Sequence, residues 1–183
     1  MQELKFIKLT KCFLENPYRE FYLRELAKKL KISTFATKKY CEFLLKNDLI
    51  LEERKANLRY FKANLNNLIF RYFKISLNIS LLMKTNLIEF LKENIPNISS
   101  IILFGSMAKG ENDEKSDIDI LVIGKEKYLN LNKFEEKLNR NITVHMYKWG
   151  DWNKKAKEDN PFYFEVISYG INLFGEMPLV KWK

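Results

Sequence analysis

The chain of 183 residues is 46% hydrophobic and 14% aromatic, and it carries a formal net charge of +9. This composition excludes a disordered chain and predicts one large or two small domains with packed cores. No apolar run approaches the ~18 residues that a membrane-spanning helix needs, so we expect no membrane association.

The positive charge is unevenly distributed along the chain. Residues 1–95 carry the whole excess of +9, whereas residues 96–183 contain equal numbers of basic and acidic side chains. Such asymmetry indicates an anionic partner for the N-terminal half, with nucleic acid favoured over a membrane. A lysine-rich surface kept for solubility is the alternative.

The cysteines and the N-terminus indicate the cellular compartment. Cys12 and Cys41 lie in helix-like segments without the spacing of metal ligands, and no secretory leader precedes them. Residues 1–5 lack the apolar core of a signal peptide. We therefore expect a reduced, cytoplasmic protein.

The first half of the chain is expected to be mostly helical, because no glycine or proline occurs between Pro17 and Pro96. Apolar spacing predicts one helix that ends near Pro17, a second over 21–30, and a third over 33–47 with a serine as its N-cap. Residues 51–62 then predict a β-hairpin with a basic tip.

Three helices followed by a hairpin resemble the winged helix-turn-helix, most closely in residues 23–28 and 44–50. The resemblance implies that the third helix enters the major groove of DNA and that the hairpin, as the wing, contacts phosphates. The residues expected to bind DNA are Thr34, Phe35, Lys38 and Lys39 of the third helix and Arg54, Lys55 and Arg59 of the wing. The alternative is a winged helix that makes only protein contacts.

Residues 65–95 repeat apolar side chains at helical spacing. This pattern predicts a helical linker whose later part begins the C-terminal domain and whose apolar face offers a seam for a homodimer. We therefore expect an N-terminal domain over 1–65, a linker over 66–95 and a second domain over 96–183.

A strand, a turn and a second strand over residues 101–123 carry the side chains that predict chemistry. Asp117 and Asp119 lie two residues apart, so they project from one face of the strand while their apolar neighbours enter the core. Two adjacent carboxylates repel each other, and a divalent cation relieves that repulsion. Because Mg²⁺ takes one or two carboxylates and completes its shell with water and phosphates, we predict a Mg²⁺ site here.

The turn before these aspartates predicts a phosphate site. Gly105 lets the backbone approach a ligand, and free N–H groups at the start of the following helix favour an anion. Ser106 adds a hydroxyl and Lys109 a positive charge, so turn and aspartates together predict a nucleoside-triphosphate (NTP) site. A chance glycine turn beside two solvated aspartates is the alternative.

A family resemblance rests on Gly105-Ser106, Gly110, Ser116-Asp117 and Asp119. Together they resemble the signature of minimal nucleotidyltransferases in the DNA polymerase β superfamily. The resemblance implies nucleotide transfer, with Asp117 and Asp119 as catalytic metal ligands and Ser116 as a further nucleotide-binding residue. Minimal nucleotidyltransferases are often antitoxins that modify a toxin, so an antitoxin-like role and a protein partner are implied as well.

Beyond the second strand, the pattern predicts a helix over 125–139 and a third strand over 141–149. Active enzymes of the superfamily usually carry a third acidic residue on this strand, and here the strand has none. His145 could take part in proton transfer or bind a softer metal, but a histidine hydrogen-bonded within the sheet is the favoured interpretation. Asp151 is a second candidate, although an acid there favours a helix N-terminus.

Residues 151–156 and 160–167 predict two more helices, and residues 171–175 a short apolar end piece. From 141 to 175 the chain resembles orphan nucleotidyltransferase domains fused to helix-turn-helix modules. The expected fold class is α+β, with an N-terminal winged helix-turn-helix, a helical linker and a small C-terminal mixed-sheet nucleotidyltransferase domain.

Two functions are compatible with these features. The first is an enzyme that binds NTP with Mg²⁺ and transfers a nucleotide to a macromolecular acceptor, while its N-terminal domain binds DNA. The second is a catalytically inactive DNA-binding transcriptional regulator whose C-terminal domain senses a nucleotide or contacts a protein. Replacing both aspartates with asparagine separates the two, because only the enzyme has transfer to lose.

Overall fold

The structure is a computed structural model that describes residues 2–158 and 161–181. The chain divides into two compact units, residues 1–74 and 75–183, and each unit has its own sheet. This division also separates the charge. Residues 1–74 carry the whole excess of +9, and residues 75–183 hold equal numbers of basic and acidic side chains.

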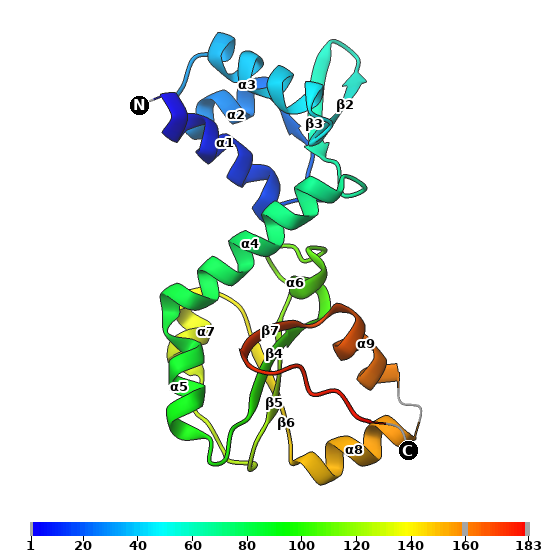
Figure 1. Ribbon diagram of the computed structural model, residues 1–183. Coiled ribbons are helices and arrows are strands. Elements are labelled where there is room, and N and C mark those ends of the chain that lie inside the picture. The colour runs from blue at the N-terminus through cyan, green and yellow to red at the C-terminus, as the bar shows by residue number, and fades with distance from the viewer. Residues whose placement is uncertain (1, 159–160, 182–183) are drawn as a thin grey trace. The chain divides into compact units, whose positions relative to one another are not determined.

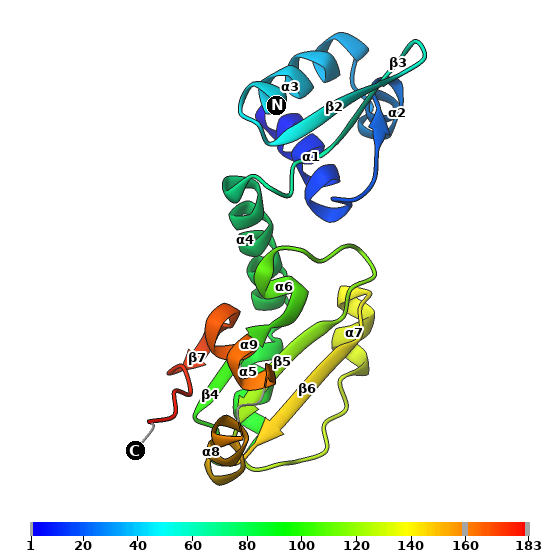
Figure 2. The ribbon, with the colours of Figure 1, turned by 90° about the vertical axis from the view of Figure 1, so that its right-hand side faces the viewer.

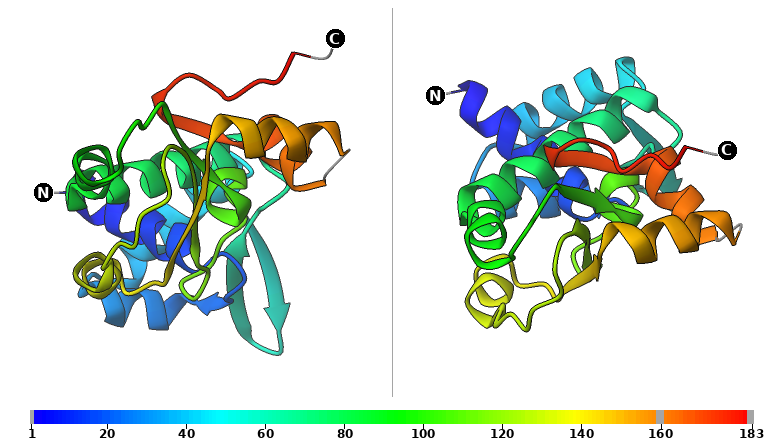
Figure 3. Two further views of the ribbon diagram at one scale, coloured as in Figure 1. Left: turned by 90° about the horizontal axis from the view of Figure 1, so that it is seen from below. Right: turned by 60° about the horizontal axis from the view of Figure 1, so that its bottom comes forward.

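In the first unit, helices pack against a small antiparallel sheet of strand order β1-β3-β2. The helices are α1 (Gln2–Glu15), α2 (Leu23–Leu30) and α3 (Thr34–Lys46). The strands are β1 (Phe21–Tyr22), β2 (Ile50–Lys55) and β3 (Leu58–Ala63). The predicted hairpin is confirmed as β2 and β3, and its tip extends away from these helices (Figure 3, left).

Local interactions explain where these elements begin. The Ser33 hydroxyl accepts a hydrogen bond from the Ala36 backbone N–H at 3.2 Å, which caps α3 at the predicted residue. The helix predicted over 21–30 begins two residues later than expected. Phe21 and Tyr22 pair with β3 instead, because a third strand satisfies the hydrogen bonds at that edge of the hairpin.

Both cysteines are buried in helices of this unit, Cys12 in α1 and Cys41 in α3, and neither forms a disulfide. Burial raises the pKa of the Cys41 thiol to about 12. At neutral pH this thiol therefore stays protonated and behaves as a small apolar side chain. The two cysteines contribute to packing, and their burial keeps them from reacting.

Residues 65–95 are largely helical, as predicted, with α4 over Leu68–Thr85 and α5 over Leu87–Asn94. The division between the two units falls within α4. The side chains of Leu87 and Leu91 on α5 are fully buried in a core of the second unit. The segment expected as a linker is therefore divided: the start of α4 belongs to the first unit, and the rest of α4 and α5 belong to the second.

The second unit is built on a four-stranded mixed sheet of order β6-β5-β4-β7. β4 runs antiparallel to β5 and β7, whereas β6 is parallel to β5; Figure 2 shows β4, β5 and β6 side by side. The strands are β4 (Ser100–Phe104), β5 (Ile118–Ile123), β6 (Ile142–Tyr147) and β7 (Ile171–Gly175). The helices are α6 (Gly105–Lys109), α7 (Asn132–Leu138), α8 (Trp149–Lys157) and α9 (Pro161–Tyr169).

Helices cover both faces of this sheet, with α5 and α7 on one face and α8 and α9 on the other (Figure 1). Because side chains alternate along β5, Ile120 enters the core beneath α5 and α7, and Leu121 enters the core beneath α8 and α9. The strand β4 is buried along its whole length. None of the helices in the described part of the chain has both the length and the apolar character needed to cross a membrane.

One expected helix is much shorter in the structure. The pattern over 125–139 predicts a helix, but only α7, Asn132–Leu138, is helical. Residues 125–131 form a loop, and Leu129 and Leu131 pack against the core from this loop. Apolar side chains two residues apart share a face of an extended chain but not of a helix, so the spacing of Leu129 and Leu131 suits the observed loop.

The C-terminal part follows the expected order with one difference. The apolar end piece over 171–175 is the strand β7, which pairs with β4 and completes the sheet. The third strand and the two helices after it are found as β6, α8 and α9. Asn160, the first residue of the segment expected as the last helix, lies outside the described residues.

Candidate active site

The two aspartates lie at one end of the sheet in the second unit. Asp119 is the second residue of β5, opposite Phe104 of β4 and Thr143 of β6. Asp117 lies one residue before the strand and accepts a hydrogen bond from the Asn141 amide, Nδ2 to Oδ1 at 3.0 Å. Asp117 is exposed and Asp119 is half-buried, so both carboxylates can be reached from solvent.

Gly105 begins α6 directly after β4 and lies against Asp119. Its φ of +69° is in the left-handed region that favours glycine, and a Cβ at this position would lie 2.5 Å from Asp119 Oδ2. Real Cβ atoms essentially never come this close to another heavy atom, so any side chain at residue 105 would displace the carboxylate. Glycine therefore brings the start of α6 into contact with the aspartate.

The Asp119 carboxyl lies in a field of negative charge. Burial is the largest cause of its raised pKa; His145 acts in the opposite direction, and the charges of Asp117 and Glu165 add to the rise. Each of these effects follows from the cost of burying a charge and from Coulomb interactions between neighbouring groups. A cation bound beside Asp119 would relieve this repulsion.

We expect Asp119→Asn to raise the melting temperature of the second unit at neutral pH, because the change removes a half-buried charge from beside two carboxylates. An acid whose pKa is raised in the folded state lowers stability above that pKa, and the loss disappears as the pH falls through it. After allowance for solvent screening, the gain should be on the order of 2 °C. Thermal melts at neutral and acidic pH measure it, and a gain that grows toward acid would contradict the assignment.

The other predicted nucleotide-binding residues lie on α6 and in the loop before β5. Lys109 ends α6, and its Nζ lies 2.8 Å from Oε1 of Glu165 on α9. The Ser106 hydroxyl makes no hydrogen bond to another residue in the described part of the chain, so a ligand can use it. The Ser116 hydroxyl donates to Asp113 Oδ1 and accepts from the Asp113 N–H, both at 2.9 Å, which shapes the loop before β5.

His145 lies half-buried on β6, on the same face of the sheet as Asp119. Its ring centroid is 5.5 Å from that of Phe104 and 5.3 Å from that of Phe162. No hydrogen bond joins its ring to another residue that the structure describes, so aromatic contacts take the place of the expected hydrogen bond. Asp151 lies in the first turn of α8, where an acid was expected to favour the helix N-terminus.

Several polar residues near the site could not be predicted from the sequence. Glu165 is 56 positions from Lys109, and no local pattern links them. The buried Asn78 amide donates to Met107 O at 2.9 Å and to Asn112 Oδ1 at 2.8 Å, which ties the loop after α6 to α4. Such long-range pairs carry no sequence signal.

In the first unit, the residues predicted to bind DNA lie on α3 and on the hairpin. Thr34, Phe35, Lys38 and Lys39 of α3 all have exposed side chains. Arg54, Lys55 and Arg59 of the hairpin each lie near an acidic side chain. Arg59 is the most firmly held, since its Nε and one terminal nitrogen each donate to a different Glu52 oxygen at 2.7 Å. Much of the charge of the hairpin is therefore compensated within the unit.

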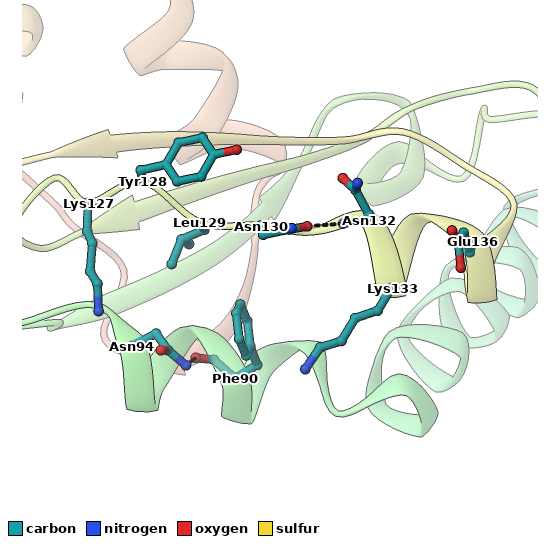
Figure 4. A pocket seen from close by; sticks show the side chains of 9 residues that line it. All are labelled: Phe90, Asn94, Lys127, Tyr128, Leu129, Asn130, Asn132, Lys133 and Glu136. Atoms are coloured by element: carbon teal, nitrogen blue, oxygen red, sulfur yellow. Dashed lines mark hydrogen bonds between the residues drawn. The ribbon is translucent and has the colours of Figure 1, made fainter.

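A hollow of about 520 Å³ lies on the α5 and α7 face of the sheet. Phe90 and Asn94 of α5, residues 127–130 of the loop and three side chains of α7 line it (Figure 4). Lys133 Nζ lies 4.7 Å from the Phe90 ring centroid, so its ammonium makes a cation–π contact with this ring. None of the predicted site residues lines the hollow, and the carboxylates lie on the other face.

The second unit thus places two aspartates at one end of a mixed sheet beside a helix that starts with Gly105 and Ser106. The family model described as "Polymerase beta, Nucleotidyltransferase" matches residues 85–178, just over half of the chain. The chain therefore belongs to the polymerase β nucleotidyltransferase family. No curated protein matches it.

Similar solved structures come from toxin–antitoxin systems. One is a toxin–antitoxin complex with AMP-PNP, with 24% identity and a TM-score of 0.36 over 50% of this chain and 73% of that chain. Another is a mutant of the toxin–antitoxin pair MntA-HpeT, with 22% identity and a TM-score of 0.34 over 51% of this chain and 72% of that chain.

Proposed function

We propose that the protein binds an NTP with Mg²⁺ and transfers its nucleotide to a macromolecular acceptor. The observation that carries this proposal is the contact between Gly105 and Asp119, because it brings a phosphate-binding type of turn against a carboxylate within a polymerase β type of domain. The pair of aspartates and the Ser106 hydroxyl add a proposed metal site and a further donor for the triphosphate.

Asp117 and Asp119 suit Mg²⁺. Within the part of the chain that the structure describes, no group of three or more His, Cys, Asp or Glu side chains is placed to hold a metal alone. The ion would therefore rely on the two carboxylates, water and substrate phosphates, which is the coordination that Mg²⁺ favours. When bound, Mg²⁺ neutralises phosphate charge and polarises the phosphoryl group.

The residues of the site position and neutralise the substrate. Gly105 and Ser106 offer a backbone N–H and a hydroxyl to the triphosphate, and Lys109 offers a positive charge. An acceptor hydroxyl attacks the α-phosphorus and loses its proton to water, the bond to the bridging oxygen breaks, and pyrophosphate leaves. Because β6 offers no carboxylate to activate the acceptor, we expect slow turnover or an acceptor activated by its own partner.

The experiment that tests this function is incubation of the purified chain with each α-labelled NTP and Mg²⁺ or Mn²⁺, with and without cell extract. Label that enters protein or nucleic acid supports transfer and identifies the class of acceptor. No label with any nucleotide, metal or extract would contradict the enzymatic function.

We propose that residues 1–65 form a winged helix that binds DNA. Support comes from the helices packed on the sheet β1-β3-β2, from the exposed leading turns of α3, and from the charge excess in the first unit. The expected contacts are Thr34, Phe35, Lys38 and Lys39 in the major groove and Arg54, Lys55 and Arg59 on phosphates.

We expect Lys38→Ala with Lys39→Ala to weaken DNA binding about ten-fold and to reduce the slope of log affinity against log salt by about two. Lys8→Ala on α1 is the matched control, since this lysine is also exposed but lies outside α3. Fluorescence anisotropy at several salt concentrations measures both. Equal affinity for the variant and the wild type, or binding that salt does not change, would contradict the assignment.

A second candidate function is a DNA-binding transcriptional regulator without catalysis. It is favoured by Thr143, which stands opposite Asp119 on a strand that carries no acid. In this function the second unit senses a nucleotide or contacts a protein, whereas an antitoxin-like role, in which the protein modifies a toxin with a nucleotide, belongs to the enzymatic function. The exposed apolar side chains at the start of α4, Leu68, Ile69, Tyr72 and Phe73, offer a surface for a protein partner or a homodimer.

A further inference from the structure

The ion pair between Lys109 and Glu165 joins two elements beside the aspartates. Lys109 is the last residue of α6, and Glu165 lies in the middle of α9. Their charged atoms are 2.8 Å apart, and the Lys109 and Glu165 side chains are 25% and 39% exposed. The Lys109 ammonium also lies 5.1 Å from the centroid of the Tyr169 ring, one helical turn beyond Glu165. In the free protein the ammonium is thus held on the α9 side.

Glu165 is also electrostatically linked to the proposed metal site. Its charge is one of the causes of the raised pKa of Asp119, so the two carboxylates lie in the same field. Its hydrogen bond to Lys109 is the main cause of the raised pKa of that lysine. Glu165 therefore influences both the cation and the carboxylate that the proposed reaction uses.

We propose that Glu165 is a positioning residue. It binds the Lys109 ammonium in the free protein and releases it when the triphosphate of a nucleotide binds there. The inference rests on the proposed function, because it assumes that a triphosphate enters beside α6. A partly exposed ion pair is weak, and lysine reaches a new partner readily because its charge is on a flexible four-carbon stem. A triphosphate, with several negative charges, competes well with one carboxylate.

The exchange has one consequence for the site. Glu165 competes with the nucleotide for Lys109, so the carboxylate opposes nucleotide binding until it releases the ammonium. The triphosphate must therefore displace this carboxylate before it gains the charge of Lys109.

The test is the affinity of the full chain for an NTP analogue whose α–β bridge cannot be cleaved, measured by calorimetry with Mg²⁺. Lys109→Met should weaken binding about ten-fold or more, since it removes a charged contact to phosphate. Glu165→Gln should bind about two- to five-fold tighter than the wild type, because the competing charge is gone. When Glu165→Gln is added to the Lys109→Met protein, the affinity for the analogue should not change further, because Glu165 acts through Lys109.

Matched controls are Lys115→Met and Glu114→Gln, which make the same charge changes at exposed positions of the neighbouring loop. If the pair serves only to hold α6 against α9, Glu165→Gln weakens binding or leaves it unchanged, and the exchange is wrong. An effect of Glu165→Gln that persists without Lys109 also overturns it. A wild type that binds no analogue overturns the proposed function together with this inference, whereas wild-type binding without a gain in Glu165→Gln overturns the inference alone.

Discussion

The variant with both Asp117→Asn and Asp119→Asn should lose nucleotide transfer by about a thousand-fold or more while the second unit stays folded. The two carboxylates are the proposed ligands of the cation that neutralises the transferred phosphate, and such electrostatic contributions are among the largest in catalysis. Asparagine keeps the shape of each side chain, and Asp119→Asn removes the charge whose burial raises the pKa of that carboxyl. The rate of label transfer and the affinity for Mn²⁺ measure the loss.

The matched control for this variant is Glu114→Gln, an exposed acid of the same loop whose side chain is outside the proposed site. It should transfer label at the wild-type rate. DNA affinity of the double variant should also be unchanged, because the proposed DNA-binding residues belong to the first unit. Wild-type transfer by the double variant would show that the proposed site is wrong.

A second large effect is expected from Gly105→Ala, which should reduce transfer about a hundred-fold. The new Cβ would lie 2.5 Å from Asp119 Oδ2 in a backbone conformation with φ of +69°. Either the carboxylate or the start of α6 must move to relieve this clash. A displacement of about 1 Å near the reacting atoms can lower a rate about a hundred-fold. The strained backbone should also lower stability by about 1 kcal/mol.

Gly150→Ala is the control for this change, because a Cβ at Gly150 meets nothing within 4 Å and the backbone there is not left-handed. It should leave both transfer and melting temperature near the wild-type values. The comparison requires circular dichroism to show that the Gly105→Ala protein is folded. Full transfer by a folded Gly105→Ala protein would contradict the role assigned to this contact.

Local sequence was sufficient wherever an element is defined by its own residues. The N-cap Ser33, the hairpin over 51–62 and the alternation of β5 all depend on interactions within a few residues, and the structure contains each of them. The glycine turn and the two aspartates could also be located, because their spacing is short and strand geometry fixes which face they share.

Long-range contacts could not be predicted in the same way. The strand β7 is recognisable only through its pairing with β4, and the loop over 125–131 replaces a helix because its leucines pack against a distant core. Glu165 joins the site through an ion pair across 56 positions. The roles of Ser116 and the basic residues of the hairpin stay predictions, and the structure adds that acidic or polar neighbours already occupy their side chains.

The measurement that tests the central claim most directly compares NTP labelled at the α-phosphate with NTP labelled at the γ-phosphate. With purified protein, Mg²⁺ and extract, nucleotidyl transfer predicts that the α label enters the acceptor while the γ label appears as pyrophosphate. Both signals should vanish in the Asp117→Asn, Asp119→Asn protein. Transfer of the γ label, or transfer of the α label that survives in this variant, would contradict a nucleotidyltransferase that acts through these two aspartates.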